Sequence, residues 1–119
     1  MNVAPKPFVY RATVLTIRDG DSITADLDLG FDVTLANQGV RLDGMDAPEL
    51  KTAEGVAART FLATLIAPGQ RLTIRTKLAD SREKFGRILA ELWREGDAES
   101  LNAKMILAGH AKPYSGGKR

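Results

Sequence analysis

The stretch Ser22-Ile23-Thr24-Ala25-Asp26-Leu27-Asp28-Leu29 alternates polar and apolar side chains without a break. Successive side chains of a strand point to opposite faces, so this period of two predicts a strand with one buried face. Residues 8–18 before it are rich in β-branched side chains, and Asp19-Gly20 between the two segments favours a tight turn. We therefore expect the two strands to pair antiparallel.

Further elements follow on the C-terminal side of this hairpin. Gly30-Phe31-Asp32 favours a reversal into a third strand, in which Asn37-Gln38-Gly39 indicates a bulge or a bend, and Pro48 ends regular pairing after it. Ser100 is expected to cap the last helix. The predicted elements are a strand over residues 33–42, a helix over 54–67, strands over 71–77 and 86–94, and a helix over 101–108.

Five short strands, with a helix between the third and the fourth, suit a small closed barrel, which leaves no sheet edge open to aggregation. The predicted fold class is α+β and rich in β-structure: a five-stranded barrel of the oligonucleotide-binding (OB) type, packed with two helices. At 119 residues, 44% of them hydrophobic, the chain is of the usual size for one domain. We expect that domain over residues 8–114, with flexible termini at 1–7 and 115–119.

Charge is segregated along the chain. The net charge of +2 is too small for a protein that coats nucleic acid by charge alone, so any such affinity must be local. Residues 18–50 contain eight acidic residues against Arg18 and Arg41, which favours cation binding. Residues 70–94 reverse the balance, with seven basic residues against three acidic ones, which favours phosphate binding.

Composition also excludes several classes of chemistry. The chain has no cysteine, which rules out disulfides, thiolate metal sites and thiol catalysis. Residues 1–7 have no signal-peptide pattern, and no apolar run approaches membrane-spanning length. We expect no membrane association and a cytoplasmic location for the chain as written, or secretion if a leader was removed.

Three clusters carry the candidate chemistry. They are Asp19-Gly20-Asp21-Ser22, then the run from Arg41 to Glu49, then Glu83-Lys84-Phe85-Gly86-Arg87. Singly, they are typical of a turn, a loop leading into a helix and a solvated strand. Together they supply acids for a hard divalent cation, one further carboxylate to handle a proton, and two guanidinium groups suited to a phosphate. This set indicates metal-dependent phosphodiester cleavage.

From about Val14 to Tyr114, the chain resembles the staphylococcal nuclease (thermonuclease) family. The resemblance rests on the three clusters, in matching order and spacing, and on residues 102–111 with their Gly-His-Ala end. It implies a five-stranded OB barrel with packed helices, and a calcium-dependent nuclease that cuts DNA and RNA to leave 3′-phosphate ends.

The resemblance also implies roles for individual residues. Asp21, Asp46 and the backbone carbonyl of Ala47 would bind Ca²⁺ directly, and Asp19 would act through water. Family members commonly have Thr in place of Ala47 and often Tyr in place of Phe85. The phosphate would be held by Arg41 and Arg87, Glu49 would orient or deprotonate the attacking water, and the substrate would contact Lys84, Phe85 and Tyr114.

The leading hypothesis is therefore a monomeric calcium-dependent nuclease acting on DNA, RNA or both. The alternative is a catalytically silent OB-fold module that binds nucleic acid, and a third hypothesis is a calcium-binding interaction domain. At Glu49, positioning of water is an alternative to proton abstraction, because a carboxylate is a weak base for water. Asp43 lies two residues after Arg41, so in a strand both side chains would point to the same face. Asp43 is therefore a candidate ion-pair partner of that arginine.

Overall fold

The first two strands of the chain form a hairpin. The computed structural model describes residues 8–76 and 85–114. The strands are β1 (Val9–Asp19), β2 (Ser22–Asp28), β3 (Thr34–Leu42), β4 (Met45–Asp46), β5 (Arg71–Thr76), β6 (Ile88–Arg94) and β7 (Lys112–Pro113), and the helices are α1 (Ala53–Leu65) and α2 (Leu101–Leu107). In the first hairpin Asp19 pairs with Ser22, so the turn residues are Gly20 and Asp21.

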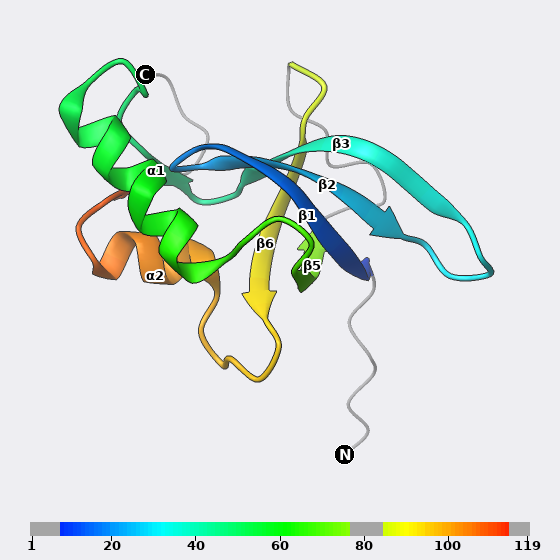
Figure 1. Ribbon diagram of the computed structural model, residues 1–119. Helices are drawn as coiled ribbons and strands as arrows, with labels where there is room; N and C mark the ends of the chain where they lie inside the picture. The colour runs from blue at the N-terminus through cyan, green and yellow to red at the C-terminus, as the bar shows by residue number, and fades with distance from the viewer. Residues whose placement is uncertain (1–7, 77–84, 115–119) are drawn as a thin grey trace.

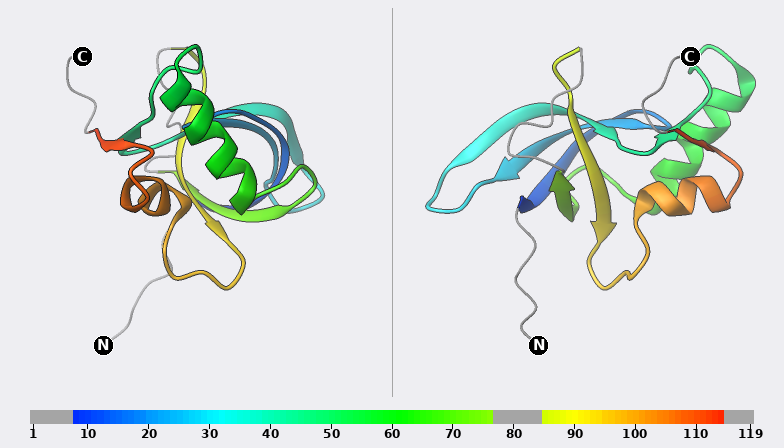
Figure 2. Two further views of the ribbon diagram at one scale, coloured as in Figure 1. Left: turned by 60° about the vertical axis from the view of Figure 1, so that its left-hand side comes forward. Right: turned by 180° about the vertical axis from the view of Figure 1, so that it is seen from behind.

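Five strands close into a barrel in the order β1-β2-β3-β6-β5, and β1 closes it by pairing with β5. All neighbours are antiparallel except β3 and β6, which run parallel through Val40, Arg41 and Leu42. Figure 2 shows the barrel with both helices outside it. The predicted five-stranded barrel with two helices, of the OB type, is confirmed.

The alternation in β2 fills the barrel interior. Ile23 and Ala25 are fully buried and Leu27 nearly so, whereas Asp28 at the end of the strand is exposed. Helix α1 adds Ala58 and Leu62 to the same core. One apolar face of β2 therefore supplies the centre of the fold, as the period of two predicts.

Both helices begin at polar caps. The Thr52 hydroxyl accepts from the Gly55 N–H at 2.9 Å, and the Ser100 hydroxyl accepts from the Ala103 N–H at 3.0 Å. Each cap satisfies an amide that has no partner within its helix. The predicted Ser100 cap is confirmed. Neither described helix has the length and apolar content needed to cross a membrane.

The predicted bulge in β3 is also confirmed. Pairing with β2 shifts register between Ala25 and Leu27, opposite a segment in which Asn37 has a φ of 53°. The Asn37 N–H is held by the Asp26 carboxylate at 2.8 Å. Beyond this bulge the β2–β3 hairpin projects from the barrel, away from the helices (Figure 1).

One pairing was not predicted. Met45 and Asp46 of β4 pair antiparallel with Pro113 and Lys112 of β7. The Tyr114 N–H extends this contact by donating to the Gly44 carbonyl at 2.9 Å. The C-terminal end of the described chain is thereby attached to the segment that carries Asp46.

Candidate functional site

The β1–β2 turn is docked tightly on its surroundings. A Cβ added to Gly20 would lie 2.7 Å from the Cβ of Ala58 and 2.9 Å from that of Ala47. Only glycine lets the turn approach helix α1 and the loop after β4 so closely. Within the turn, one Asp19 oxygen accepts from the Asp21 N–H and the Ser22 hydroxyl, each at 3.0 Å.

Asp21 connects this turn to the segment 42–47. Its carboxylate accepts from the Ala47 N–H at 3.0 Å, and its carbonyl accepts from the Leu42 N–H at 2.8 Å. The residue is only 8% exposed. The turn and the loop that carry the predicted metal ligands are therefore fixed to each other by Asp21.

Arg41 lies between two of the predicted metal ligands. Its Nη2 is 3.0 Å from Asp46 Oδ1 and 3.6 Å from Asp21 Oδ2, and its Nη1 donates to the Met45 carbonyl at 3.2 Å. The guanidinium also lies over the Tyr114 ring, 5.7 Å from the ring centre. Arg41 is 5% exposed, so these carboxylates compensate a buried charge.

The two acids of the turn have opposite shifts in pKa. Burial, followed by the hydrogen bond with the Asp19 side chain, raises the pKa of Asp21 to about 6. Burial acts to raise the pKa of Asp19 as well, but hydrogen bonds from Asp21 and Ser22 and the positive charge of Arg87 outweigh it and lower this pKa. The two carboxyls of one turn therefore differ in how readily they ionise.

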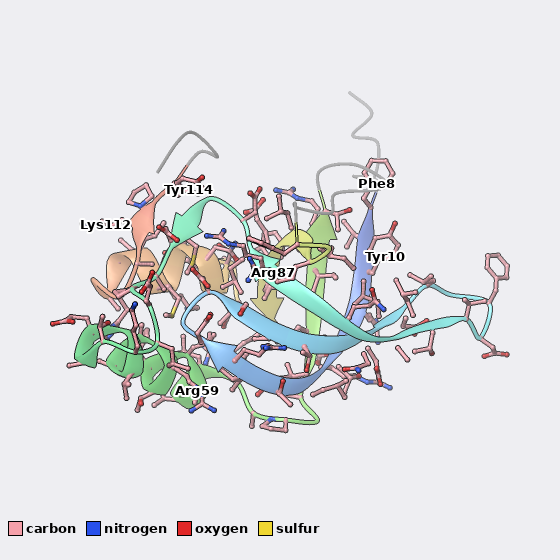
Figure 3. The ribbon with its side chains drawn as sticks, turned by 90° about the horizontal axis from the view of Figure 1, so that it is seen from above. Phe8, Tyr10, Arg59, Arg87, Lys112 and Tyr114 are labelled. Atoms are coloured by element: carbon pink, nitrogen blue, oxygen red, sulfur yellow. The ribbon has the colours of Figure 1, made fainter. Side chains whose placement is uncertain are left out.

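Arg87 approaches the site from the segment before β6. Its charge acts on Asp19, and its Cγ would be 3.0 Å from a Cβ added to Gly39, so its stem lies against β3. Its guanidinium lies over the Phe85 ring, 5.7 Å from the ring centre, and Phe85 is 72% exposed. Figure 3 shows Arg87 beside β3, well separated from Arg59 on helix α1.

Glu49 is placed differently from the other predicted site residues. Its carboxylate pairs with Lys51 at 3.2 Å, and both side chains are largely exposed. Its carbonyl accepts from the N–H and the hydroxyl of Thr52, just ahead of helix α1. The contacts of Glu49 thus belong to the loop that leads into the helix. The predicted substrate contact Lys84 lies outside the described residues.

The arrangement fits a hard cation in its chemistry. Asp19, Asp21 and Asp46 offer only oxygen donors, and a divalent ion beside Asp21 would offset the burial that raises the pKa of this carboxyl. In residues 8–76 and 85–114, however, no three acidic or histidine side chains converge in a ready-made metal cluster. Asp46 instead faces Arg41, so backbone carbonyls, water or substrate must complete any coordination shell.

Sequence reasoning missed two parts of this site. One is the close approach that Gly20 permits, since Asp-Gly is already explained as a turn. The other is Asn102, a buried amide in α2 that donates to the Asp43 carbonyl at 2.7 Å. A polar side chain next to Leu101 and one helical turn before Met105, both buried, is the signal that marks it.

Comparison with protein families agrees with this geometry. The family model described as Staphylococcal nuclease homologue matches residues 39–118, which include the end of β3, the Arg41–Glu49 run, Arg87 and both helices. No curated protein matches the chain. The matched region covers well over half of the sequence, and the closed barrel is the fold expected of that family. The chain belongs to the staphylococcal nuclease homologue family.

Proposed function

We propose that this protein is a calcium-dependent nuclease that hydrolyses phosphodiester bonds of DNA and RNA and, as the family resemblance implies, leaves 3′-phosphate ends. The observation that supports this most strongly is the buried Arg41 between Asp21 and Asp46, with Asp19 and Arg87 beside it. Few structural needs explain three acids and two guanidinium groups at one end of a small barrel. Phosphate chemistry needs both kinds of group.

In this proposal, Asp21, Asp46 and the Ala47 carbonyl hold the cation, and Asp19 acts through water. A bound Ca²⁺ ion supplies Lewis acidity toward a phosphate oxygen and favours ionisation of a nearby water. The chain's own residues do the positioning. The Ala47 N–H orients the Asp21 carboxylate, and Asp19 holds the turn through its bonds to Asp21 and Ser22.

Arg87 and Arg41 would stabilise the phosphate as negative charge builds on its equatorial oxygens. Arg87 is half-buried, with its stem against Gly39 and its guanidinium over the Phe85 ring. These contacts limit its rotamers. Arg41 already has carboxylate partners, so it would contact the phosphate with donors that remain, or when a cation takes over Asp21 and Asp46. Phe85 and Tyr114 offer aromatic faces next to these two arginines for stacking with a base.

Glu49 would orient the attacking water or accept its proton. The exposed Glu49–Lys51 pair breaks at little cost, because exposed ion pairs contribute on the order of 0–1 kcal/mol. The carboxylate can therefore turn toward a bound substrate. The same pair also favours the rival function, a silent nucleic-acid-binding module, because it leaves Glu49 engaged elsewhere.

A nuclease assay separates these functions. Single-stranded DNA and RNA are incubated with the parent, Glu49→Gln and Arg87→Ala, in calcium and in chelator. We expect cleavage only with calcium, and a loss of roughly 100-fold in Arg87→Ala, because one preorganised charged donor has about that effect on rate. Arg71→Ala, which removes an exposed arginine of β5, is the matched control and should keep parent activity.

Two other results would contradict the proposal. Intact substrate in calcium, together with a mobility shift of the DNA, would establish the silent binding module. Calcium binding by calorimetry, with neither cleavage nor a mobility shift, would establish a calcium-binding interaction domain.

A further inference from the structure

Asn102 joins three segments through one buried side chain. Its Oδ1 accepts from the Leu92 N–H at 3.0 Å, while its Nδ2 donates to the Asp43 carbonyl at 2.7 Å and to the Ala90 carbonyl at 3.1 Å. The residue is 5% exposed and lies in the first turn of α2. Its amide thus uses the acceptor and both donors at once.

The Asp43 carbonyl is the informative partner, because it belongs to the turn between the two charged groups of the site. Asp43 and Gly44 connect Arg41 at the end of β3 with Asp46 in β4. Gly44 has a φ of 78°, and the Asp43 N–H donates to the Ala90 carbonyl at 2.9 Å. The turn is therefore held by β6 on its N–H side, and on its carbonyl side by Asn102 at Asp43 and by the Tyr114 N–H at Gly44.

The position of this turn sets the distance between Arg41 and Asp46. Their ion pair is 3.0 Å long, and Arg41 also donates to the Met45 carbonyl at 3.2 Å. A small displacement of Asp43 would move Asp46 along the chain while leaving Arg41 fixed in the barrel. The geometry of an ion pair such as Arg41–Asp46 is sensitive to displacements of about 0.5 Å.

We propose that Asn102 is a positioning residue, which acts through the Asp43–Gly44 turn to hold Asp46 beside Arg41 and the Ala47 N–H on Asp21. This inference rests on the proposed function for its effect on calcium and substrate. It assigns to helix α2 a role in the site, although Asn102 touches neither a ligand nor the reacting groups. Substitution of residues that orient metal ligands without touching the metal commonly lowers metal affinity about 10–100-fold.

The test compares three substitutions of Asn102. Asn102→Asp keeps the shape and the acceptor for Leu92 but places an oxygen against the carbonyls of Asp43 and Ala90. Asn102→Ala removes all three bonds, and Asn102→Ser is a milder change if the others fail to fold. The control is Leu27→Val or Leu27→Ala, whichever lowers the free energy of unfolding by an amount closer to that lost in the Asn102 variants. Leu27 is suitable because it is buried at the end of β2 that lies away from the candidate site.

Four quantities are measured: hydrogen exchange of the Ala47 amide in metal-free protein, the Kd for calcium by calorimetry, kcat, and KM. For Asn102→Asp and Asn102→Ala we expect faster Ala47 exchange, a calcium Kd raised at least about tenfold and a lower kcat. The Leu27 control should stay within about twofold of the parent in calcium Kd and kcat, because its effect is on global stability.

Equal values in the Asn102 variants and in the Leu27 control would overturn the inference and leave Asn102 as a purely structural residue. Failure of the proposed function appears differently, since the parent itself would then neither bind calcium nor cleave. In that event Ala47 exchange in metal-free protein still decides whether Asn102 positions the loop.

Discussion

The two ends of the β2–β3 pair are built in opposite ways. At one end, Ser22 pairs with Arg41, and the adjoining polar side chains are buried and bonded to residues far away in the sequence. At the other end, Asp28 pairs with Thr34, and the turn between them has a fully exposed Phe31. The same two strands therefore lead from the candidate site to the most exposed part of the described chain.

The difference shows where the conformation of each end comes from. The turn at residues 30–32 is held by three local bonds: Leu29 N–H to the Val33 carbonyl, Val33 N–H to the Gly30 carbonyl, and Gly30 N–H to the Asp28 carboxylate. Within this turn, Phe31 and Asp32 have φ values of 57° and 61°. A positive φ costs conformational energy in residues other than glycine. The site end relies instead on contacts from α1, α2, β6 and β7. Substitutions should consequently have large, non-local effects at the site end and small, local ones at the turn.

The largest effect is expected from Arg41→Lys. Lysine has one ammonium in place of a planar fork, so it cannot contact Asp46, Asp21 and the Met45 carbonyl together or present paired donors to a phosphate. We expect cleavage to fall roughly 100-fold. Arg75→Lys is the matched control, because Arg75 forms a partly exposed ion pair with Glu91 between β5 and β6. Equal activity of the two variants would contradict the role given to Arg41.

Gly55→Ala should come next, through folding stability. Alanine normally favours a helix interior by about 1 kcal/mol over glycine. Here its Cβ would lie 1.9 Å from the Glu49 carbonyl oxygen, so the loop would have to move. We expect a loss of about 2 kcal/mol or more in urea unfolding, within the range for overpacked sites.

Gly30→Ala in the projecting turn is the comparison for Gly55→Ala. An added Cβ at Gly30 meets nothing within 4 Å, but the residue has a φ of 82°. The loss should therefore be only about 1 kcal/mol, the cost of a left-handed conformation. A greater loss for Gly30→Ala than for Gly55→Ala would reverse the contrast between the two ends.

Asp21→Asn should stabilise the metal-free protein at neutral pH. The pKa of Asp21 is raised from 3.8 to about 6 by burial and by Asp19, so the folded state binds a proton more tightly than the unfolded state does. Stability therefore falls as pH rises from about 4 to above 6, and an amide removes this loss. Because the lost ion pair with Arg41 opposes the gain, we expect about 1 kcal/mol at pH 8.

The measurement for Asp21→Asn is urea unfolding in chelator at pH 8 and pH 5. The gain should shrink at pH 5, where Asp21 is mostly protonated, and added calcium should stabilise the parent but not the variant. Asp28→Asn near the projecting turn is the control, with a change below about 0.5 kcal/mol at both pH values. A variant that is less stable than the parent at pH 8 would contradict the raised pKa of Asp21.

The smallest effect is expected from Phe31→Gly. Glycine adopts a positive φ without steric cost, and Phe31 buries no surface, so relief of strain should outweigh the greater freedom of the unfolded chain by about 0.5 kcal/mol. Val33→Gly, at an exposed position without positive φ, should lower stability. Cleavage should not change in either variant, and a drop in Phe31→Gly would show that the projecting turn takes part in activity.

Most of the fold was predictable because it follows from local patterns. The alternation of polar and apolar residues predicted β2, the change to helical spacing predicted α1, and Ser100 marked the start of α2. The two-residue pairing of β4 with β7 was not predictable in this way, since such short strands have no periodicity.

The site was predictable as a set of residues but not as an arrangement. The motifs brought together Asp21, Arg41 and Asp46, and the structure places these three in contact. That Arg41 pairs with both acids depends on the register of β2 with β3 and on the turn at Asp43. The exposed contact of Glu49 with Lys51 and the reach of Asn102 from α2 depend likewise on tertiary packing, which no single motif encodes.

The pairing of β4 with β7 also bears on how the protein is made. A chain grows from its N-terminus, so Lys112, Pro113 and Tyr114 leave the ribosome after every other described residue. Until they emerge, the backbone of Asp46 lacks its partner strand, and Arg41 lacks the ring that covers it. If the protein cleaves RNA, its site is therefore completed only once residue 114 has emerged, so the acids and arginines of the site are all synthesised before the site can be assembled.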